Sequence, residues 1–208
     1  MKSTRLPLCA ALIASALAIN GASAGGWQTA SPEQVAKAIA SSWKGLPPDL
    51  QARVEQDAAM AVCSSSRNSP SKAEADRIEA DAKASIVYPA SGTLIGDWKL
   101  GEKGALNGAG FRMGDNPKAE AGGNCYACHQ LSPAEISYGT LGPSLLGYGR
   151  LKGNTSEAQK EVYAKIYNAQ VVLPCSNMPR FGVNKVLTPE QIANYVALLL
   201  DPDSPVNK

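Results

Sequence analysis

The pentapeptide Cys125-Tyr126-Ala127-Cys128-His129 constrains this chain more than any other feature of its sequence. Two cysteines separated by two residues, with a histidine directly after the second, form the C-x-x-C-H signature of covalent haem attachment. The thiols are spaced to form thioethers with the two vinyl groups of one porphyrin, and the following imidazole can bind the iron. The sequence therefore predicts one haem c, joined to Cys125 and Cys128 and ligated by His129.

Two other interpretations of a C-x-x-C pair fit this chain less well. A structural zinc site needs four ligands, usually from two pairs, and the sequence offers one histidine in total and no second C-x-x-C. A thioredoxin-like dithiol is expected beside a βαβ pattern, which the sequence lacks. Haem attachment is the interpretation that accounts for both cysteines and the histidine.

The first 24 residues have the pattern of a cleavable signal peptide. Lys2 and Arg5 precede an apolar run, and Ala22-Ser23-Ala24 provides a small-residue cleavage site. The apolar run is shorter than the roughly 20 residues that a bilayer-spanning helix needs, so no membrane anchor is expected. Thioether attachment of haem takes place outside the cytoplasm, and the sequence therefore predicts a periplasmic protein.

The charge balance points to neither nucleic acid nor an anionic membrane as a partner. The full chain has 20 basic and 18 acidic residues. Because Lys2 and Arg5 lie in the signal peptide, the remaining chain has 18 of each. A balanced chain lacks the basic surface by which such partners are bound.

Apolar residues recur at helical spacing along most of the chain after residue 25. Ser31, Ser71 and Thr188 each precede a Glu or Gln by three residues, which is the capping-box pattern of a helix start. A further helix is expected to run from Pro48 toward Cys63. The side chains expected to be buried are Ile78, Ala82, Ile86, Val162, Ile166, Ala169, Ile192, Tyr195, Val196 and Leu199.

These patterns predict an all-α fold. We expect an N-terminal helical extension over residues 25–87 and a haem domain over residues 88–208. A glycine-rich loop, residues 104–123, separates a helix near Trp98 from the haem motif.

A second axial iron ligand cannot be histidine, because His129 is the only one. The candidates are Met60, Met113 and Met178. We favour Met178, which lies in a loop between two predicted helices, 49 residues after His129. Thioether sulfur favours Fe(II), so His/Met ligation predicts a raised potential and an electron-transfer haem.

Cys63 and Cys175 remain after the haem motif and the signal peptide are set aside. In an oxidising compartment an even pair is most simply a disulfide, which would tie the N-terminal extension to the Met178 loop. Two free thiols, or a thiolate iron ligand from Cys175, are the alternatives.

Two segments resemble small c-type cytochromes of class I. Residues 96–102 resemble the helix that opens such a domain, and Gly142-Pro143-Ser144-Leu145 resembles the segment that passes behind the haem. The resemblance implies that the carbonyl of Pro143 accepts a hydrogen bond from Nδ1 of His129. Such an acceptor fixes the imidazole and raises its basicity.

The chain from about residue 94 to 207 further resembles the SoxX family, the monohaem subunits of SoxAX cytochromes in bacterial thiosulfate oxidation. Beside the haem motif, the segments that carry the resemblance are Gly142-Pro143-Ser144-Leu145, Lys165-Ile166-Tyr167-Asn168, Leu173-Pro174-Cys175-Ser176-Asn177-Met178-Pro179-Arg180-Phe181-Gly182, Leu187-Thr188-Pro189-Glu190-Gln191-Ile192 and Leu200-Asp201-Pro202-Asp203-Ser204-Pro205-Val206. Residues 25–87 carry little of it.

The SoxX resemblance implies a heterodimer with a SoxA cytochrome, acting as an L-cysteine S-thiosulfotransferase. That complex joins thiosulfate oxidatively to a cysteine of the carrier SoxYZ, with the bond-forming site on SoxA. The haem of this chain would accept the released electrons and pass them to a cytochrome acceptor, and no catalytic residue is expected here. The alternatives are a free-standing electron-carrier cytochrome c and a haem peroxidase, which would need an open iron coordination position.

Overall fold

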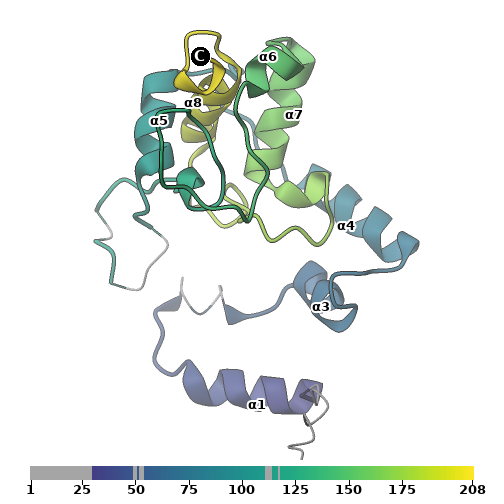
Figure 1. Ribbon diagram of the computed structural model, residues 1–208. Helices are drawn as coiled ribbons and strands as arrows, with labels where there is room; N and C mark the ends of the chain where they lie inside the picture. The colour runs from purple at the N-terminus through teal and green to yellow at the C-terminus, as the bar shows by residue number, and fades with distance from the viewer. Residues whose placement is uncertain (1–29, 49–50, 52–53, 111–113, 117) are drawn as a thin grey trace, which may run out of the picture. The chain divides into compact units, whose positions relative to one another are not determined.

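The computed structural model describes residues 30–48, 51, 54–110, 114–116 and 118–208 (Figure 1). Every regular element in these ranges is an α-helix or a 3₁₀ helix, which confirms the predicted all-α class. The chain divides into two compact units, one ending at Pro48 and one after it. The predicted signal peptide, residues 1–24, lies outside the described residues.

In the first unit, α1 spans Pro32–Ser42 and begins with a complete capping box. The Oγ atom of Ser31 accepts a hydrogen bond from the N–H of Gln34 at 3.2 Å, and the Gln34 side chain accepts one from the N–H of Ser31 at 2.7 Å. No residue of α1 is buried, and the apolar side chains of Val35 and Trp43 are exposed. The helix is therefore stabilised at its N-terminus by local bonds.

In the second unit, α3 spans Ala58–Ser65 and is shorter than the helix predicted toward Cys63. Asp57 ends the preceding segment in an extended conformation, and its carboxylate accepts a hydrogen bond from the N–H of Met60 at 2.8 Å. An aspartate in this position caps a new helix, so the continuous helix predicted from Pro48 is wrong at residues 55–57.

Helix α4 (Lys72–Ala84) follows, again with a capping box, at Ser71. Its solvent face has the ion pairs Lys72–Asp76 and Glu79–Lys83, while Ile78 and Ala82 are buried. The buried face packs against the 3₁₀ helix η2 (Ala169–Val171). Helix α4 therefore belongs to the same compact unit as the C-terminal residues. The domain boundary predicted between residues 87 and 88 stays a prediction.

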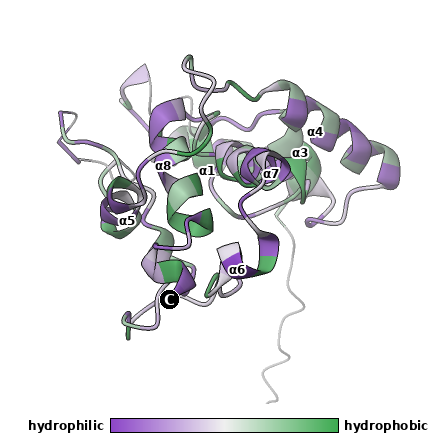
Figure 2. Cartoon of the chain, turned by 90° about the horizontal axis from the view of Figure 1, so that it is seen from above, coloured by the Kyte–Doolittle hydropathy of each residue, from purple (hydrophilic) through white to green (hydrophobic). Residues whose placement is uncertain are grey.

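The core of the second unit is built around α8 (Pro189–Leu200), with α5 (Trp98–Leu106) on one side and α7 (Ser156–Tyr167) on the other (Figure 1). Much of α8 is hydrophobic (Figure 2), and eight of its twelve residues are buried. Helix α5 approaches α8 closely at Gly101, where a Cβ atom would come closer than 3.0 Å to the carbonyl group of Asn194. Glycine is required for this contact between backbones.

The short helices α6 (Tyr148–Lys152) and η3 (Pro205–Asn207) close the end of the core where the C-terminus lies. The Asn207 amide accepts a hydrogen bond from the N–H of Gly149 at 2.8 Å and donates one to the carbonyl of Leu199 at 3.1 Å. The Arg150 guanidinium donates to the carbonyl of Asn207. Among the described residues, no helix has the length and apolar character needed to cross a membrane.

Candidate functional site

The haem motif lies at the 3₁₀ helix η1 (Cys125–Ala127), directly after Asn124 in a left-handed conformation (φ 46°). The carbonyl of Cys125 accepts hydrogen bonds from the N–H groups of Cys128 at 3.1 Å and His129 at 2.9 Å. The N–H of Asn124 donates to the carbonyl of Asn107, which is the C-cap of α5. The motif therefore forms a compact turn attached to the end of a core helix. Neither of its cysteines is in a disulfide.

The imidazole of His129 is held from two directions. Its Nδ1 atom lies 2.8 Å from the carbonyl oxygen of Pro143, so the tautomer that satisfies both groups carries the proton on Nδ1. A Cβ atom at Gly142 would come closer than 3.0 Å to three ring atoms, Cε1, Nδ1 and Nε2. The absence of a side chain at Gly142 therefore lets the backbone lie against the ring, and Nε2 keeps a free lone pair to bind a metal.

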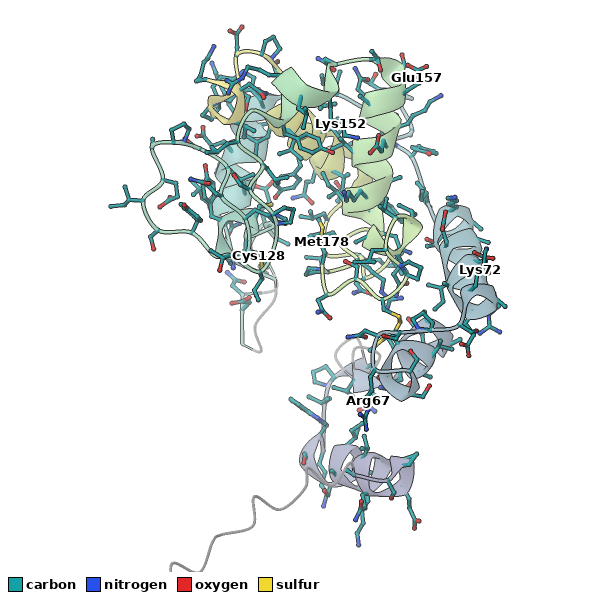
Figure 3. All side chains as sticks on the ribbon, turned by 45° about the vertical axis from the view of Figure 1, so that its right-hand side comes forward. Arg67, Lys72, Cys128, Lys152, Glu157 and Met178 are labelled. Atoms are coloured by element: carbon teal, nitrogen blue, oxygen red, sulfur yellow. A yellow bond between two sulfur atoms is a disulfide. The ribbon has the colours of Figure 1, made fainter. Side chains whose placement is uncertain are left out.

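A cavity lies beside this imidazole, with about 410 Å³ of empty space that includes space open to solvent. Cys125 and His129 lie on its wall together with Met178, which comes from the loop between α7 and α8. Cys128 and Met178 lie on neighbouring segments (Figure 3). The other lining side chains are mostly apolar and include Leu131, Leu145, Ile166, Phe181, Leu187 and Leu199. Such a lining suits a large apolar ring system bearing few polar groups.

The electrostatics of the cavity favour a neutral Cys125. Burial is the largest cause that raises the pKa of the Cys125 thiol, to about 12, and the nearby Cys128 raises it further. In the described part of the chain, no three His, Cys, Asp or Glu side chains gather as a metal site. The residues present therefore fit covalently attached haem better than a bare metal ion.

The three candidate methionines have different surroundings. Met178 is partly buried on the cavity wall, and its N–H donates to Oγ of Ser176 at 3.1 Å. Met60 is not among the lining residues, and its sulfur accepts a hydrogen bond from the Arg180 guanidinium at 3.4 Å. Met113 lies outside the described residues. Of the methionines that the structure describes, Met178 alone shares a cavity with His129.

The loop that carries Met178 is joined to α3. Cys63 and Cys175 form a disulfide with a sulfur–sulfur distance of 2.07 Å (Figure 3). The thiolate ligand considered for Cys175 is therefore not available. On the other side of Met178, Nη2 of Arg180 lies 2.6 Å from a carboxylate oxygen of Asp57. No sequence pattern around Asp57 or Arg180 predicts this ion pair.

Tyr195 is a further residue of the site. The sequence predicts that its side chain is buried but not that it lines the cavity. It lines the cavity from α8, and its hydroxyl accepts a hydrogen bond from the N–H of Gly123 at 2.9 Å. Burial raises the pKa of this hydroxyl far above its ordinary value, so it stays neutral. Tyr195 thereby connects α8 to the residues that precede the haem motif.

Comparison with known proteins gives a relative for part of the chain but no family. No protein-family model matches the chain. An uncharacterized lipoprotein of Aquifex aeolicus (strain VF5) is 46% identical over 129 residues. The matched stretch covers 62% of this chain and 61% of that protein, so the chain spans less than two thirds of the relative's length. The relative's description names no cofactor, substrate or partner.

These comparisons overturn the predicted membership of the SoxX family, which is wrong: the relative is described only as a lipoprotein, and no SoxX or cytochrome model matches. The segments that carried the resemblance have local structural roles that many unrelated chains need. Thr188 begins α8 with a capping box, and Ser204 caps η3. The thiosulfate reaction and the SoxA and SoxYZ partners, which followed from that resemblance, stay untested predictions.

Proposed function

We propose that the second unit is a monohaem c-type cytochrome domain that transfers electrons. The observation that carries this proposal is the arrangement at one cavity of Cys125 and His129 from the C-x-x-C-H turn and Met178 from a distant loop. In this proposal Cys125 and Cys128 hold haem through thioethers, while His129 and Met178 are the axial ligands. The bound haem supplies a one-electron Fe(III)/Fe(II) couple.

The chain's own residues determine what such a site can do. The Pro143 carbonyl accepts the Nδ1 proton of His129, which orients Nε2 toward the cavity and increases its basicity. The apolar lining, with Leu131 and Phe181 each less than 5% exposed, excludes water and so disfavours additional charge on an oxidised centre. Both features favour electron exchange over substrate binding, and a thioether ligand shifts the couple toward the reduced state.

The helix arrangement supports a class I cytochrome c-like fold for this domain. In the proposed fold, α5 precedes the haem motif and crosses α8, which follows the Met178 loop. The close approach at Gly101 and the hydrogen bond from the N–H of Gly96 to the carbonyl of Ala193 fix that crossing. The cavity is lined by residues of the motif turn, of α8 and, through Ile166, of α7.

A free-standing carrier in the periplasm is the form of this function that we propose, with another redox protein, such as a cytochrome, as electron acceptor. The signal-peptide pattern of residues 1–24 supports export. The description of the relative as a lipoprotein agrees with export of that protein.

Production of the full chain with haem c maturation tests the proposal. The denatured polypeptide should keep one haem by mass spectrometry, and the ferric protein should show the near-infrared methionine-to-iron charge-transfer band. Met178→Leu should abolish the band while filling the same space, since leucine and methionine have similar volumes. Met113→Leu, at the other candidate methionine, is the matched control and should keep it. A wild-type protein without covalent haem would refute the proposed function. Rapid cyanide binding by the ferric wild type would instead indicate an open, peroxidase-like iron.

A further inference from the structure

The loop that carries Met178 is attached to α3 on both sides of the methionine. Cys175 precedes Met178 by three residues and is bonded to Cys63, while Arg180 follows it by two and pairs with Asp57. Asp57 and Cys63 lie at the start and in the body of α3, so one short helix provides both attachments. The two partners of the disulfide are 112 residues apart in sequence.

We propose that α3 is a positioning element for Met178: the Cys63–Cys175 disulfide and the Asp57–Arg180 ion pair together hold the thioether at the cavity wall. This inference rests on the proposed function and assigns a role to a helix that has no contact with the haem motif among the described interactions. Asp57, Cys63, Cys175 and Arg180 are positioning residues, because they act through the loop and not on the iron.

The loop needs such support because its own structure is sparse. Between η2 and α8 the described residues form turns and no regular helix. Val172 and Leu173, at the start of the loop, are 51% and 60% exposed and contribute little packing. After Arg180 the loop is also held by the buried Phe181 and by the hydrogen bond from the N–H of Gly182 to the carbonyl of Tyr167 at 3.0 Å. The two attachments to α3 therefore act on the stretch from Val172 to Arg180, where they restrict the backbone on both sides of Met178 and favour the conformation that faces the cavity.

The Arg180 end of the loop is fixed by more than one contact. The Arg180 side chain is 16% exposed, which lowers the screening of its charge by water. Its guanidinium donates to the carboxylate of Asp57 and to the sulfur of Met60, both of which belong to the start of α3. Asp57 uses one carboxylate oxygen to cap α3 and the other to bind Arg180. Formation of α3 and fixation of the loop are thereby coupled.

Two sets of variants of the haem-loaded full chain test the role. Asp57→Asn keeps a side-chain oxygen that caps α3 but removes the charge that attracts Arg180. Its matched control is Asp97→Asn, the same change at the N-cap of α5, where the carboxylate accepts from the N–H of Lys99. The second variant combines Cys63→Ala with Cys175→Ala. Its control is Val206→Ala, which reduces global stability at a fully buried side chain of η3, near the C-terminus.

The readout is the fraction of ferric protein in which methionine is bound. Cyanide binds only after the methionine leaves, so its binding rate reports the population of the open form, and the near-infrared band reports the closed form. We expect the double cysteine variant to bind cyanide about 5- to 30-fold faster and to lose the band at a lower temperature, as removal of one or two kcal/mol of restraint implies. Asp57→Asn should give a smaller increase of about 2- to 5-fold, in keeping with a partly exposed ion pair. Asp97→Asn should match the wild type in both readouts, and Val206→Ala should match it in the cyanide-binding rate at temperatures where the fold is intact.

The outcomes separate this inference from the proposed function. If both tether variants bind cyanide at the wild-type rate and keep the band, or if Val206→Ala accelerates binding as much as they do, the positioning role is refuted while the cytochrome assignment stands. If the double cysteine variant does not fold, Asp57→Asn against Asp97→Asn decides the question alone. A wild type that carries haem but has no methionine band, or that has free thiols at Cys63 and Cys175, also refutes the inference.

Discussion

At the scale of single residues, the site depends on how the one histidine of the chain is held. His129 is close in sequence to the cysteines, but its orientation comes from Gly142 and Pro143, on the next segment of the loop. Pro143 contributes a carbonyl group and Gly142 contributes the absence of a side chain. The cytochrome-like Gly-Pro pattern indicated the first contribution. The second depends on a contact across the loop that no sequence pattern specifies.

Replacement of Gly142 by alanine should displace the imidazole. The new Cβ atom would come closer than 3.0 Å to three ring atoms, so the ring must move and its bond to Pro143 must weaken. We expect destabilisation by about 1–3 kcal/mol, as for other overpacked sites, and a weakened histidine–iron bond. Denaturant unfolding and the Soret spectrum measure the two effects. Gly108→Ala is the control, because its Cβ atom would meet only the flexible Asn124 amide at 3.3 Å. Equal stability of both variants would contradict the close packing at Gly142.

At the scale of elements, the crossing of α5 and α8 brings together the helix before the C-x-x-C-H turn and the helix after the Met178 loop. At Gly101 the backbones of the two helices approach closely, and Tyr195 follows on α8 to bind Gly123 beside the motif. Amphipathic periodicity predicts that α5 and α8 exist and which faces they bury. The point at which two helices touch depends on both sequences together, so the role of Gly101 becomes visible only in the structure.

Gly101→Ala should weaken this crossing. Alanine favours a helix over glycine by about 1 kcal/mol, but its methyl group would come closer than 3.0 Å to backbone atoms of Asn194, which cannot move without moving α8. The cost of overpacking should exceed the gain in helix propensity, so the free energy of unfolding should fall by about 1–3 kcal/mol. Denaturant titration measures it, and the exposed Lys103→Ala in the same helix should change stability by no more than about 0.5 kcal/mol. A stabilised Gly101→Ala variant would show that the helices can separate freely.

The start of α3 should give the protein a measurable response to acid. Partial burial acts to raise the pKa of the Asp57 carboxyl, but hydrogen bonds from the Met60 N–H and Arg180, with the charge of Arg180, outweigh it and lower the pKa below 3.8. Because the pKa of Asp57 is lower in the folded state, its charge stabilises the fold fully above pH 3.8. This stabilisation is lost as the pH falls through the pKa of the folded state. The difference in unfolding free energy between wild type and Asp57→Asn should therefore be constant near neutral pH and shrink in acid. A difference that grows in acid would contradict this assignment.

At the scale of the whole molecule, the parts that sequence predicts well are those decided locally. The capping boxes at Ser31, Ser71 and Thr188 begin α1, α4 and α8, because a cap needs only residues three positions apart. The interruption at Asp57 was missed because apolar spacing continues through it. The haem motif is local too, whereas the cavity that Met178 shares with His129 requires the folded chain.

The covalent connection between α3 and the Met178 loop should also provide much of the stability of the second unit. The Cys63–Cys175 disulfide closes a loop with a sequence separation of 112 residues, and in the chain-entropy model a crosslink of this length stabilises the fold by roughly 4–5 kcal/mol. Replacing both cysteines by alanine should lower the unfolding free energy by up to this amount. The denaturant m-value should rise, because an unfolded chain without the crosslink exposes more surface. A loss below about 1 kcal/mol with an unchanged m-value would mean that the unfolded chain keeps α3 near the Met178 loop without the bond, so that the ion pair to Arg180 would be the main attachment.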